Sequence, residues 1–441
     1  MDSNKVPVLI VGAGPAGLTA AITLARYGLD AMVVERRAAP STMPKATVIS
    51  TRTMEILRSW GLEDAVRAGA DDVRMRMLLS RTLAEAPGGT VVPVGYPSPE
   101  QAEMLSPTGA LCAPQDHLEP VLLAHLRTLP GVRIESGRRV EEVHPAGSGV
   151  RVRLDDGRVV QARYLIAADG AHSTVRRALD IPLAGETDVL NGVRAMFHAP
   201  LWDVVGPHRY LLYGTTEAGD GTFLPSGQGD RWIYGVARDT PDMDQRWFEH
   251  TIRRAVGAGD LPLTITRVDR FASAAQLAVS YRAGPVFLVG DAAHRVTPRG
   301  GTGLNIAVHD GFDLGWKLAW VLRGWAGPEV LDTYEAERRP VAEHHAARSA
   351  DPNGARRSVD HEMRIDLGGR LPHVWTSTAA DRVSTVDLLG PGLTMFVDAD
   401  AEPAARVGPP VTLRRLDRVT ARALGLGRGS SLLVRPDGVP A

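Results

Sequence analysis

The chain has 441 residues, of which 44% are hydrophobic, 23% charged and 5% aromatic, a composition typical of folded proteins rather than disordered ones. Its 50 basic and 51 acidic side chains give a net charge of −1, which provides no electrostatic argument for nucleic acid or an anionic membrane as a partner. The single cysteine, Cys112, excludes an internal disulfide and a cysteine cluster, and we expect no metal site. No apolar run approaches the roughly 18 to 20 residues of a membrane span, and the N-terminus lacks a signal-peptide pattern, so we expect a cytoplasmic protein.

The first expected elements are a strand, a glycine-rich turn and a helix. Residues 6–11 form a continuous apolar run, typical of a parallel strand that is buried on both faces. A helix is expected to follow and to end near Tyr27. A second strand at 31–34 ends at Glu35 and completes a βαβ unit of about 30 residues. Between this strand and this helix lies the turn Gly12-Ala13-Gly14-Pro15-Ala16-Gly17.

This turn, in this context, is the fingerprint of a dinucleotide-binding fold. Gly12 permits the tight turn, Gly14 lets the backbone approach a pyrophosphate, and Gly17 lets the helix pack closely on the strand. The helix N-terminus faces the phosphate charge. Glu35 lies about 18 residues beyond the last glycine, where a carboxylate binds the ribose hydroxyl groups. The sequence therefore predicts a bound dinucleotide, but this motif does not distinguish NAD from FAD.

Short helices and strands alternate over the next hundred residues. Helices are expected at 52–58 and 118–129, whereas residues 72–102 show no regular pattern. Strand-like segments follow at 132–134, 139–143, 150–154 and 159–167. The turn signal Asp155-Asp156-Gly157 indicates a hairpin between the last two of them.

The pattern changes between about residues 181 and 280. Short segments near 210–213, 222–224 and 231–236 are separated by glycine-rich turns and are typical of an antiparallel sheet. Two interpretations of the aromatic residues on this sheet stay open and are compatible: a core between the sheet and helices, or the wall of a hydrophobic substrate pocket. The residues concerned are Phe197, Trp202, Tyr210, Tyr213, Phe223, Trp232 and Tyr234.

A further buried strand, at 285–289, leads to Gly290 and Asp291. A glycine-rich loop at 297–303 then precedes a helix expected at 304–322. Small residues recur every four positions on this helix, so it can lie close to a sheet or a cofactor; they are Ala307, Gly311, Gly315 and Ala319. Another helix is expected at 329–347, and the last 90 or so residues contain strand-like segments at 393–397, 411–416 and 431–434.

Two longer motifs carry a family resemblance that covers nearly the whole chain. The segment 164–177 (YLIAADGAHSTVRR) resembles the Asp-Gly segment of flavoprotein aromatic hydroxylases. The segment 290–305 (GDAAHRVTPRGGTGLN) resembles their second FAD-binding segment. The chain is thus similar to single-component, para-hydroxybenzoate-hydroxylase-like FAD monooxygenases, in the branch that hydroxylates phenols and aromatic polyketides.

The resemblance implies an α/β fold with three parts. A Rossmann-like FAD domain of the glutathione-reductase type would comprise residues 1–72, 103–180 and 281–350. An inserted antiparallel-sheet substrate domain would comprise residues 73–102 and 181–280. Residues 351–441 would form a small thioredoxin-like C-terminal domain, without a CxxC motif.

The resemblance also assigns residues to FAD. The turn from Gly12 to Gly17, including Ala13, Pro15 and Ala16, would cradle the pyrophosphate, while Glu35 binds the ribose and Arg36 lies near the adenine. Lys45 stands where the family usually has arginine, and it supplies a point charge in place of a fork-shaped contact.

Further FAD contacts are implied along the rest of the chain. Gln115 would contact the phosphate or ribityl chain, Val140 the adenosine through its backbone, and Asp291 the ribityl hydroxyl groups. Asp169 lies in the segment shared between FAD and NAD(P)H. Helix-terminal N–H groups would face the flavin pyrimidine and stabilise the anionic reduced flavin; they belong to Gly303, Leu304 and Asn305.

The implied activity is NAD(P)H-consuming hydroxylation of a phenolic or polycyclic aromatic natural product through a flavin C4a-hydroperoxide, as in antibiotic biosynthesis. Lowering the pKa of a phenol by one or two units requires roughly 1.4–2.7 kcal/mol of preferential phenolate binding. The candidates for acting on the phenol are Arg231 and Tyr213 or Tyr234, and Pro298 is expected to abut the flavin edge where oxygen reacts. For Arg231 a turn position in solvent stays open, and for the two tyrosines a place in the core with a bonded hydroxyl group.

The expected partners are the aromatic substrate, O2 and NADPH or NADH as a transient co-substrate, and the protein is expected to be a monomer or homodimer. Two alternatives to hydroxylation stay open. One is Baeyer–Villiger-type or ring-cleaving oxygenation, including drug inactivation, which uses the same flavin chemistry. The other is a flavin protein that binds a reactive intermediate without oxygenating it.

Overall fold

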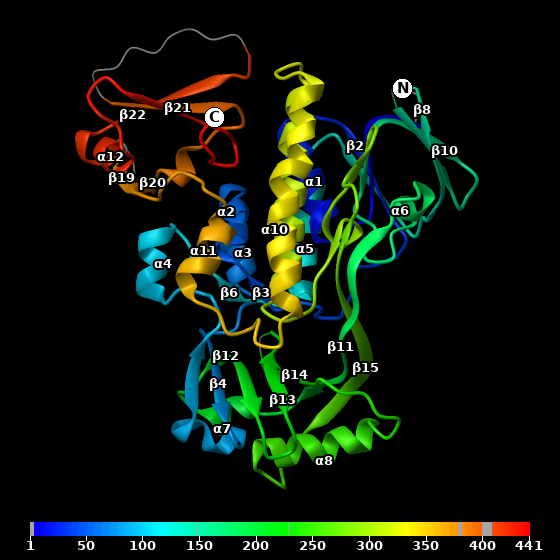
Figure 1. Cartoon of the computed structure of the whole chain (residues 1–441), viewed down its shortest axis with the longest axis vertical. Helices are drawn as coiled ribbons and strands as arrows, with labels where there is room; N and C mark the ends of the chain where they lie inside the picture. The colour runs from blue at the N-terminus through cyan, green and yellow to red at the C-terminus, as the bar shows by residue number, and fades with distance from the viewer. Residues whose placement is uncertain (1–3, 148, 228, 378–381, 399–407) are drawn as a thin grey trace.

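The computed structural model describes residues 4–147, 149–227, 229–377, 382–398 and 408–441. Two eight-stranded sheets dominate this part of the chain. In Figure 1 the first lies in the upper half among helices, and the second lies in the lower half above helix α8 (Gln245–Val256). A small three-stranded sheet near the C-terminus lies at the upper left.

The first sheet has a parallel centre built from buried apolar strands. Its order is β16-β17-β10-β1-β2-β7, with β9 joined through β10 and β8 through β9. Val8, Leu9 and Ile10 of the central strand are fully buried, as the apolar run at the N-terminus predicts. The strands are β1 (Lys5–Val11), β2 (Ala31–Glu35), β7 (Val132–Ser136), β8 (Val140–Ala146), β9 (Gly149–Leu154), β10 (Val159–Ala167), β16 (Arg282–Ala283) and β17 (Val286–Leu288).

Helices α1 (Pro15–Arg26) and α9 (Gly303–Leu322) cross at very short range beside this sheet. A Cβ atom added to Gly311 would lie 2.3 Å from the carbonyl oxygen of Ala16, and one added to Gly315 would lie 2.7 Å from Cβ of Thr23. The small residues of α9 therefore bring it against another helix, not against the sheet. This contact fixes the start of α9 relative to the glycine-rich turn before α1.

Further helices surround the first sheet. The helix expected at 329–347 is a 3-10 turn, η3 (Pro328–Asp332), followed by α10, because Pro328 opens a separate tight turn before Thr333 begins the long helix. In Figure 1, α10 runs along the middle of the molecule. The α-helices are α2 (Thr51–Ser59), α3 (Glu63–Arg67), α5 (Gln115–Thr128), α6 (Thr174–Ala178) and α10 (Thr333–Ala350).

The second sheet has the order β18-β15-β11-β14-β13-β12-β4-β5. Its longest strands, β11 (Leu183–His198) and β15 (Thr264–Ala278), pair antiparallel and run from the first sheet into the lower half of the molecule (Figure 1). The others are β4 (Arg74–Ser80), β5 (Thr90–Pro93), β12 (Tyr210–Thr215), β13 (Gly221–Pro225), β14 (Arg231–Val236) and β18 (His294–Arg295).

The expectation of an irregular segment at 72–102 is wrong. Strand β4 lies there and pairs in parallel with β12 and antiparallel with β5. The segment also contains the 3-10 helix η1 (Leu83–Gly88) and helix α4 (Pro99–Leu105). Since the partner of β4 lies about 135 residues away in the sequence, local pattern gave no indication of the pairing.

The C-terminal region has its own small core. Strands β21 (Leu393–Asp398), β22 (Val411–Leu416) and β23 (Ser431–Val434) match the predicted segments within one residue and form a sheet of order β22-β21-β23. Residues such as Phe396 and Val434 are fully buried in it. The remaining elements are α11 (Val359–Leu367), β19 (Trp375–Ser377), β20 (Arg382–Ser384), the 3-10 helix η4 (Val386–Leu388) and α12 (Arg418–Ala423). The thioredoxin-like topology stays a prediction.

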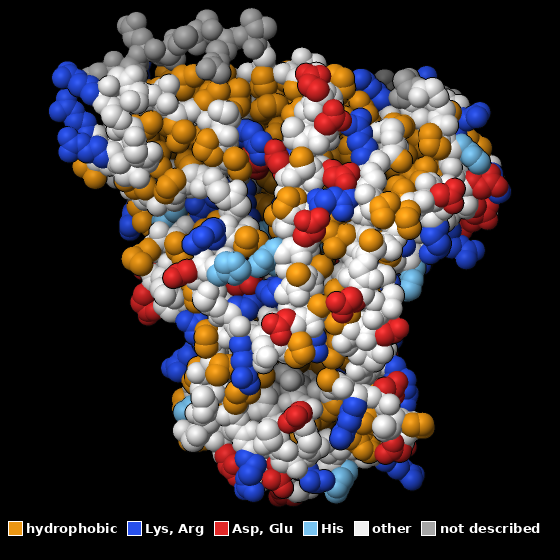
Figure 2. Space-filling view, viewed as in Figure 1, with side chains coloured by type: hydrophobic (Ala, Val, Ile, Leu, Met, Phe, Trp, Pro, Cys, Tyr) orange, Lys and Arg blue, Asp and Glu red, His pale blue; other side chains and the backbone are white. Residues whose placement is uncertain are grey.

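Figure 2 shows acidic and basic side chains interspersed over the face it displays. Among the described residues, no helix has both the length and the hydropathy needed to cross a membrane.

Candidate active site

A cavity of about 830 Å³ extends from the glycine-rich turn of the first sheet to the second sheet. Its wall includes Gly14 and Glu35 at one end, Asp291 and Pro298 in the middle, and Arg194 on strand β11. This volume lies within the usual range for cofactor and small-molecule sites. The cavity thus joins the predicted dinucleotide site to the predicted substrate sheet.

The glycine-rich turn has the geometry that its sequence predicts. Gly12 has a φ of +105°, and a Cβ atom there would lie 2.3 Å from the carbonyl oxygen of Ala168. At Gly17 a Cβ atom would lie 2.0 Å from the carbonyl oxygen of Gly12. At Gly14, by contrast, it would meet no atom within 4 Å, and this residue borders the cavity. The turn therefore leaves an open cradle at the N-terminus of α1, where a pyrophosphate would fit.

Two carboxylates border the same end of the cavity. Glu35 accepts hydrogen bonds from the backbone N–H groups of Ala13 and Arg37, both at 2.8 Å. Asp169 accepts hydrogen bonds from the N–H groups of Thr174 (2.7 Å) and Val175 (3.1 Å). Its Oδ1 atom is buried without a partner among the described residues, and burial raises the pKa of this carboxyl group. An unpartnered acceptor beside the phosphate cradle fits a ligand with hydroxyl donors.

Asp291 is held at the cavity by a buried network around Asp310. Asp310 accepts hydrogen bonds from the backbone N–H of Gly290 (3.0 Å) and from Arg338 (2.8 Å), and its Oδ2 lies 2.6 Å from Nε2 of His294. Burial alone would raise the pKa of Asp310, but the charges of His294 and Arg338 lower it to about 2. The ionised carboxylate therefore fixes the turn that presents Asp291, whose own pKa is raised by burial.

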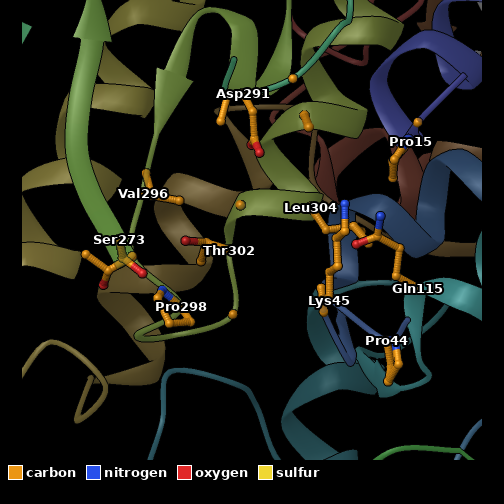
Figure 3. A pocket seen from close by; sticks show the side chains of 18 of the residues that line it. Pro15, Pro44, Lys45, Gln115, Ser273, Asp291, Val296, Pro298, Thr302 and Leu304 are labelled. Carbon is orange, nitrogen blue, oxygen red and sulfur yellow. The ribbon is translucent and has the colours of Figure 1, made fainter. Parts of the chain in front are cut away.

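Lys45 and Gln115 lie together on the other side of the cavity (Figure 3). Gln115 begins helix α5, and its side-chain amide donates to Glu119 at 2.6 Å. Burial lowers the pKa of Lys45, and the charge of Arg37 lowers it further, whereas Glu119 and Asp291 favour the ammonium form. A bound phosphate would compensate the cost of burying this lysine.

The loop before α9 is held firmly at the middle of the cavity. The Arg348 guanidinium donates to the carbonyl of Arg299 (3.2 Å) and to Oγ1 of Thr302 (2.8 Å). The carbonyl of Gly300 accepts from Arg357 (3.0 Å) and from the hydroxyl of Tyr96 (3.3 Å). The loop therefore presents Pro298 toward the cavity, on the side of Ser273 of β15 (Figure 3).

Most of the predicted FAD residues border the cavity, and the others lie directly behind its wall. The cavity-lining members are Gly12, Gly14, Pro15, Ala16, Glu35, Arg36, Lys45, Gln115, Val140, Asp169, Asp291, Gly303 and Leu304. Ala13 and Gly17 complete the turn without lining the cavity. Asn305 also lies behind the wall, because its side chain binds the backbone of Ser50, Val48 and Gly301.

The structure places three of the four expected catalytic residues away from the cavity. Arg231 forms a bidentate ion pair with Asp116 (2.7 and 3.1 Å). Tyr213 and Tyr234 are fully buried in the core beneath the sheet, and the Tyr213 hydroxyl donates to the carbonyl of His208 at 3.0 Å. Only Pro298 lines the cavity, so the expectation for the other three is corrected.

The reason is the two-residue alternation of the strands. Most aromatic residues of the second sheet, among them both expected tyrosines, point to the face that packs on α8, for example Tyr234 against Phe248 (ring centroids 6.4 Å apart). The side of the sheet toward the cavity carries mostly smaller side chains, together with Arg194 and Phe271; the smaller ones include Thr222, Leu224, Ile233 and Gly235. The structure thus favours the interpretation of the aromatic residues as a sheet core.

Two groups of three potential metal ligands occur among the described residues. In the first, Glu362 is already paired with Arg357 and lies near His344 and His345. In the second, Asp313 and Glu337 both contact Lys317, at 2.8 and 2.9 Å. Side chains of arginine or lysine already pair with the carboxylates of both groups, which therefore form ion-pair networks.

Comparison with known families agrees with this geometry. Residues 5–349 match the model of an FAD binding domain, and residues 365–441 match that of the C-terminal part of aromatic-ring hydroxylases. The chain belongs to this family of FAD-binding aromatic-ring hydroxylases, and it is an FAD-dependent monooxygenase.

Individual relatives are similar over almost their full length. An aklavinone 12-hydroxylase of Streptomyces purpurascens is 35% identical, covering 100% of this chain and 96% of the relative. The tetracenomycin B2 monooxygenase-dioxygenase of Streptomyces olivaceus is 32% identical over 100% and 95% of the two chains. A crystal structure of a ternary complex of aklavinone-11 hydroxylase with FAD and aklavinone superposes with a TM-score of 0.88, at 32% identity over 100% and 96%.

Proposed function

We propose that this chain hydroxylates an aromatic polyketide, with FAD as its cofactor, O2 as oxidant and NADPH or NADH as reductant. The observation that carries the proposal is the continuous cavity, which runs from a phosphate cradle at Gly14 to an apolar sheet face at Ile233 and Leu224. Relatives whose names include aklavinone and tetracenomycin support a polycyclic substrate.

FAD would lie with its pyrophosphate at the turn before α1, its ribose near Glu35 and its ribityl chain near Asp291. When bound, it supplies two-electron transfer from a nicotinamide and the activation of O2. The N-terminus of α9, at Gly303 and Leu304, borders the cavity and carries a partial positive charge that stabilises negative charge there.

The chain's own residues would orient the substrate and exclude water. The loop that carries Pro298 borders the cavity, and Tyr96 and Arg357 hold this loop in place through the carbonyl of Gly300. On the sheet side, Leu224 and Ile233 offer apolar contact to a planar ring system. These contacts would fix the ring beside the predicted flavin position, and a fixed orientation is required for selective attack on one ring carbon.

The test is NAD(P)H oxidation by the FAD-loaded enzyme with and without anthraquinone and tetracene polyketides, followed by mass spectrometry of the product. We expect at least one polyketide to stimulate oxidation and to gain one oxygen atom. A product with a cleaved or lactonised ring would instead indicate Baeyer–Villiger-type chemistry. Absence of stimulation and of product with every member of the panel would favour a protein that binds an intermediate without oxygenating it.

A further inference from the structure

Arg194 is an arginine of the cavity wall that lacks a carboxylate partner. It lies on β11 and borders the cavity. Its guanidinium makes no hydrogen bond or ion pair with any residue that the structure describes, and its Nε atom is buried without a partner. Its cross-strand neighbour on β15, Asp269, is paired with Arg267 at 2.7 Å. The charge of Arg194 is therefore available to a ligand.

Other arginines near the glycine-rich loop at 297–303 already donate hydrogen bonds to neighbouring groups. Arg357 donates to Glu362 and to two backbone carbonyls, and Arg299 donates to the carbonyls of Ser349 and Ala350. Arg194 lies near the ring of Phe271, whose centroid is 5.9 Å from its Cζ atom. Burial lowers the pKa of Arg194, the charge of Asp269 raises it and that of Arg267 lowers it, but neither of these two described residues forms a hydrogen bond or ion pair with Arg194. An anion in the cavity would reverse the effect of burial.

The surroundings of Arg194 leave room for a flat ring. Strand pairing aligns Arg194 with Gly235 on β14, and Gly235 with Thr222 on β13. All three border the cavity. A Cβ atom on Gly235 would meet only Cβ of Arg194, at 3.8 Å, so the glycine leaves a gap between the guanidinium and the Thr222 hydroxyl.

We propose that Arg194 binds an anionic oxygen of the aromatic substrate, a phenolate or enolate, with the ring lying over Gly235. This inference rests on the proposed function and names the group that recognises the substrate. The guanidinium presents paired N–H donors that match two adjacent oxygens of a hydroxyquinone. The proton of the phenol passes to water, and the positive charge of Arg194 stabilises the anion that remains.

The test is a pH titration of alizarin, a dihydroxyanthraquinone whose neutral and ionised forms differ in colour, bound to the FAD-loaded enzyme without NAD(P)H. In the wild type we expect the pKa of the bound probe to lie below that of the free probe. Arg194→Met should raise it by about one unit and weaken binding of the ionised probe about tenfold, while Arg194→Lys retains part of the effect. The control is Arg246→Met, which removes an exposed charge on α8, beyond the aromatic face of the sheet, and should change neither value.

Gly235→Val provides a second measurement that does not depend on the charge. The added side chain would enter the gap and should weaken probe binding at least tenfold while FAD binding is unchanged. The proposal is overturned if Arg194→Met, with normal FAD content, titrates like the wild type, if Gly235→Val binds the probe normally, or if the wild type leaves the probe's pKa unchanged. The proposed function fails on a different result, namely that no polyketide is oxygenated.

Discussion

At the scale of single residues, substitutions at Gly14 and Gly17 are expected to have different effects: one weakens FAD binding, and the other lowers the stability of the fold. The conformation of Gly14 is extended, with φ of −78°, so alanine is tolerated there, and its Cβ would point into open space. Gly14→Ala should therefore fold normally but lose FAD affinity at least tenfold, about 1.4 kcal/mol, because the methyl group occupies the phosphate cradle. Flavin titration of the refolded apoprotein measures this.

Gly17→Ala is the matched variant on the same turn. Its Cβ would lie 2.0 Å from a backbone oxygen, so we expect a loss of about 2–3 kcal/mol in the free energy of unfolding, read from urea denaturation. Equal FAD affinity in Gly14→Ala and wild type would contradict the position assigned to the pyrophosphate.

A second residue-scale prediction concerns Asp310, the ionised carboxylate behind Asp291. Asp310→Asn leaves the guanidinium of Arg338 and the buried ring of His294 without their carboxylate partner, so we expect a loss of about 3–5 kcal/mol in stability. Since the pKa of Asp310 is lowered to about 2, its contribution is complete above pH 4 and disappears as the pH falls toward 2. Urea titrations of both proteins between pH 2 and 6 would show their stabilities converging at the acidic end. A constant difference across this range would argue against an ionised Asp310.

The glycine-rich turn and Glu35 could be placed at the cavity from the sequence because each depends on a local requirement. A glycine with positive φ, a carboxylate at a strand end and a helix N-terminus all have signatures within a few residues of one another. Gln115, Val140 and Asp291 were assigned through the family resemblance, and the contacts of all these residues with FAD stay a prediction.

The substrate-side residues could not be predicted in the same way. The alternation of side chains along a strand shows that Trp232 and Tyr234 lie on the same face of the sheet. It does not show that this face packs against α8 and the opposite face borders the cavity. The sequence did contain one signal: Arg194 stands between two apolar residues, Val193 and Ala195, which are fully buried, so its side chain should lie on the other face of the sheet, toward the cavity.

At the scale of elements, a side chain of α11 caps the N-terminus of α2, although the two helices are about 300 residues apart in the sequence. Asp366 accepts hydrogen bonds from the Ser50 hydroxyl (2.7 Å) and from the backbone N–H of Arg52 (2.9 Å), in the first turn of α2. Burial raises the pKa of Asp366 to about 6, against the lowering effect of these two hydrogen bonds. The folded state therefore favours the protonated carboxyl group, relative to an unfolded pKa near 4.

This raised pKa fixes the sign of a pH dependence. The stability of the wild type relative to Asp366→Asn should fall as the pH rises from about 4 to about 6, by up to roughly 3 kcal/mol, and should be constant above that. Urea unfolding of the two proteins at several pH values measures the difference. If the difference grew with pH instead, Asp366 would be ionised in the folded protein and the assignment would be wrong.

Elements with strong local patterns were predicted closely, for example α9, expected at 304–322 and observed at 303–322. The long strands β11 and β15 were not predicted, because their pairing joins residues about 66 to 95 positions apart and both are interrupted by polar residues. Strand β4 shows the same difficulty. Pairing between distant segments, rather than local propensity, decides these elements.

At the scale of the whole molecule, a chain of charges joins the FAD-binding region to the C-terminal region. Lys317 of α9 is fully buried and contacts Asp313 and Glu337, and Arg435 also contacts Glu337 at 2.9 Å. Lys317→Met leaves the buried carboxylate of Asp313 without its cation, whereas the half-buried Glu337 keeps Arg435. We therefore expect a loss of about 3 kcal/mol in the free energy of unfolding. Urea denaturation measures the loss.

The control for Lys317 is Arg81→Met, which removes one partner of an exposed ion pair with Glu85 and should have no measurable effect. A Lys317→Met protein as stable as wild type would mean that the network does not hold the two regions together.

The central claim is that the cavity oxygenates an aromatic polyketide with FAD, and isotope labelling tests it most directly. The FAD-loaded enzyme is supplied with NAD(P)H, ¹⁸O₂ and a panel of anthraquinone and tetracene polyketides, and the masses of the products are measured by mass spectrometry. We expect a product that contains one ¹⁸O atom bound to a ring carbon. Reduced nicotinamide consumed with hydrogen peroxide as the sole product, for every compound in the panel, would contradict it.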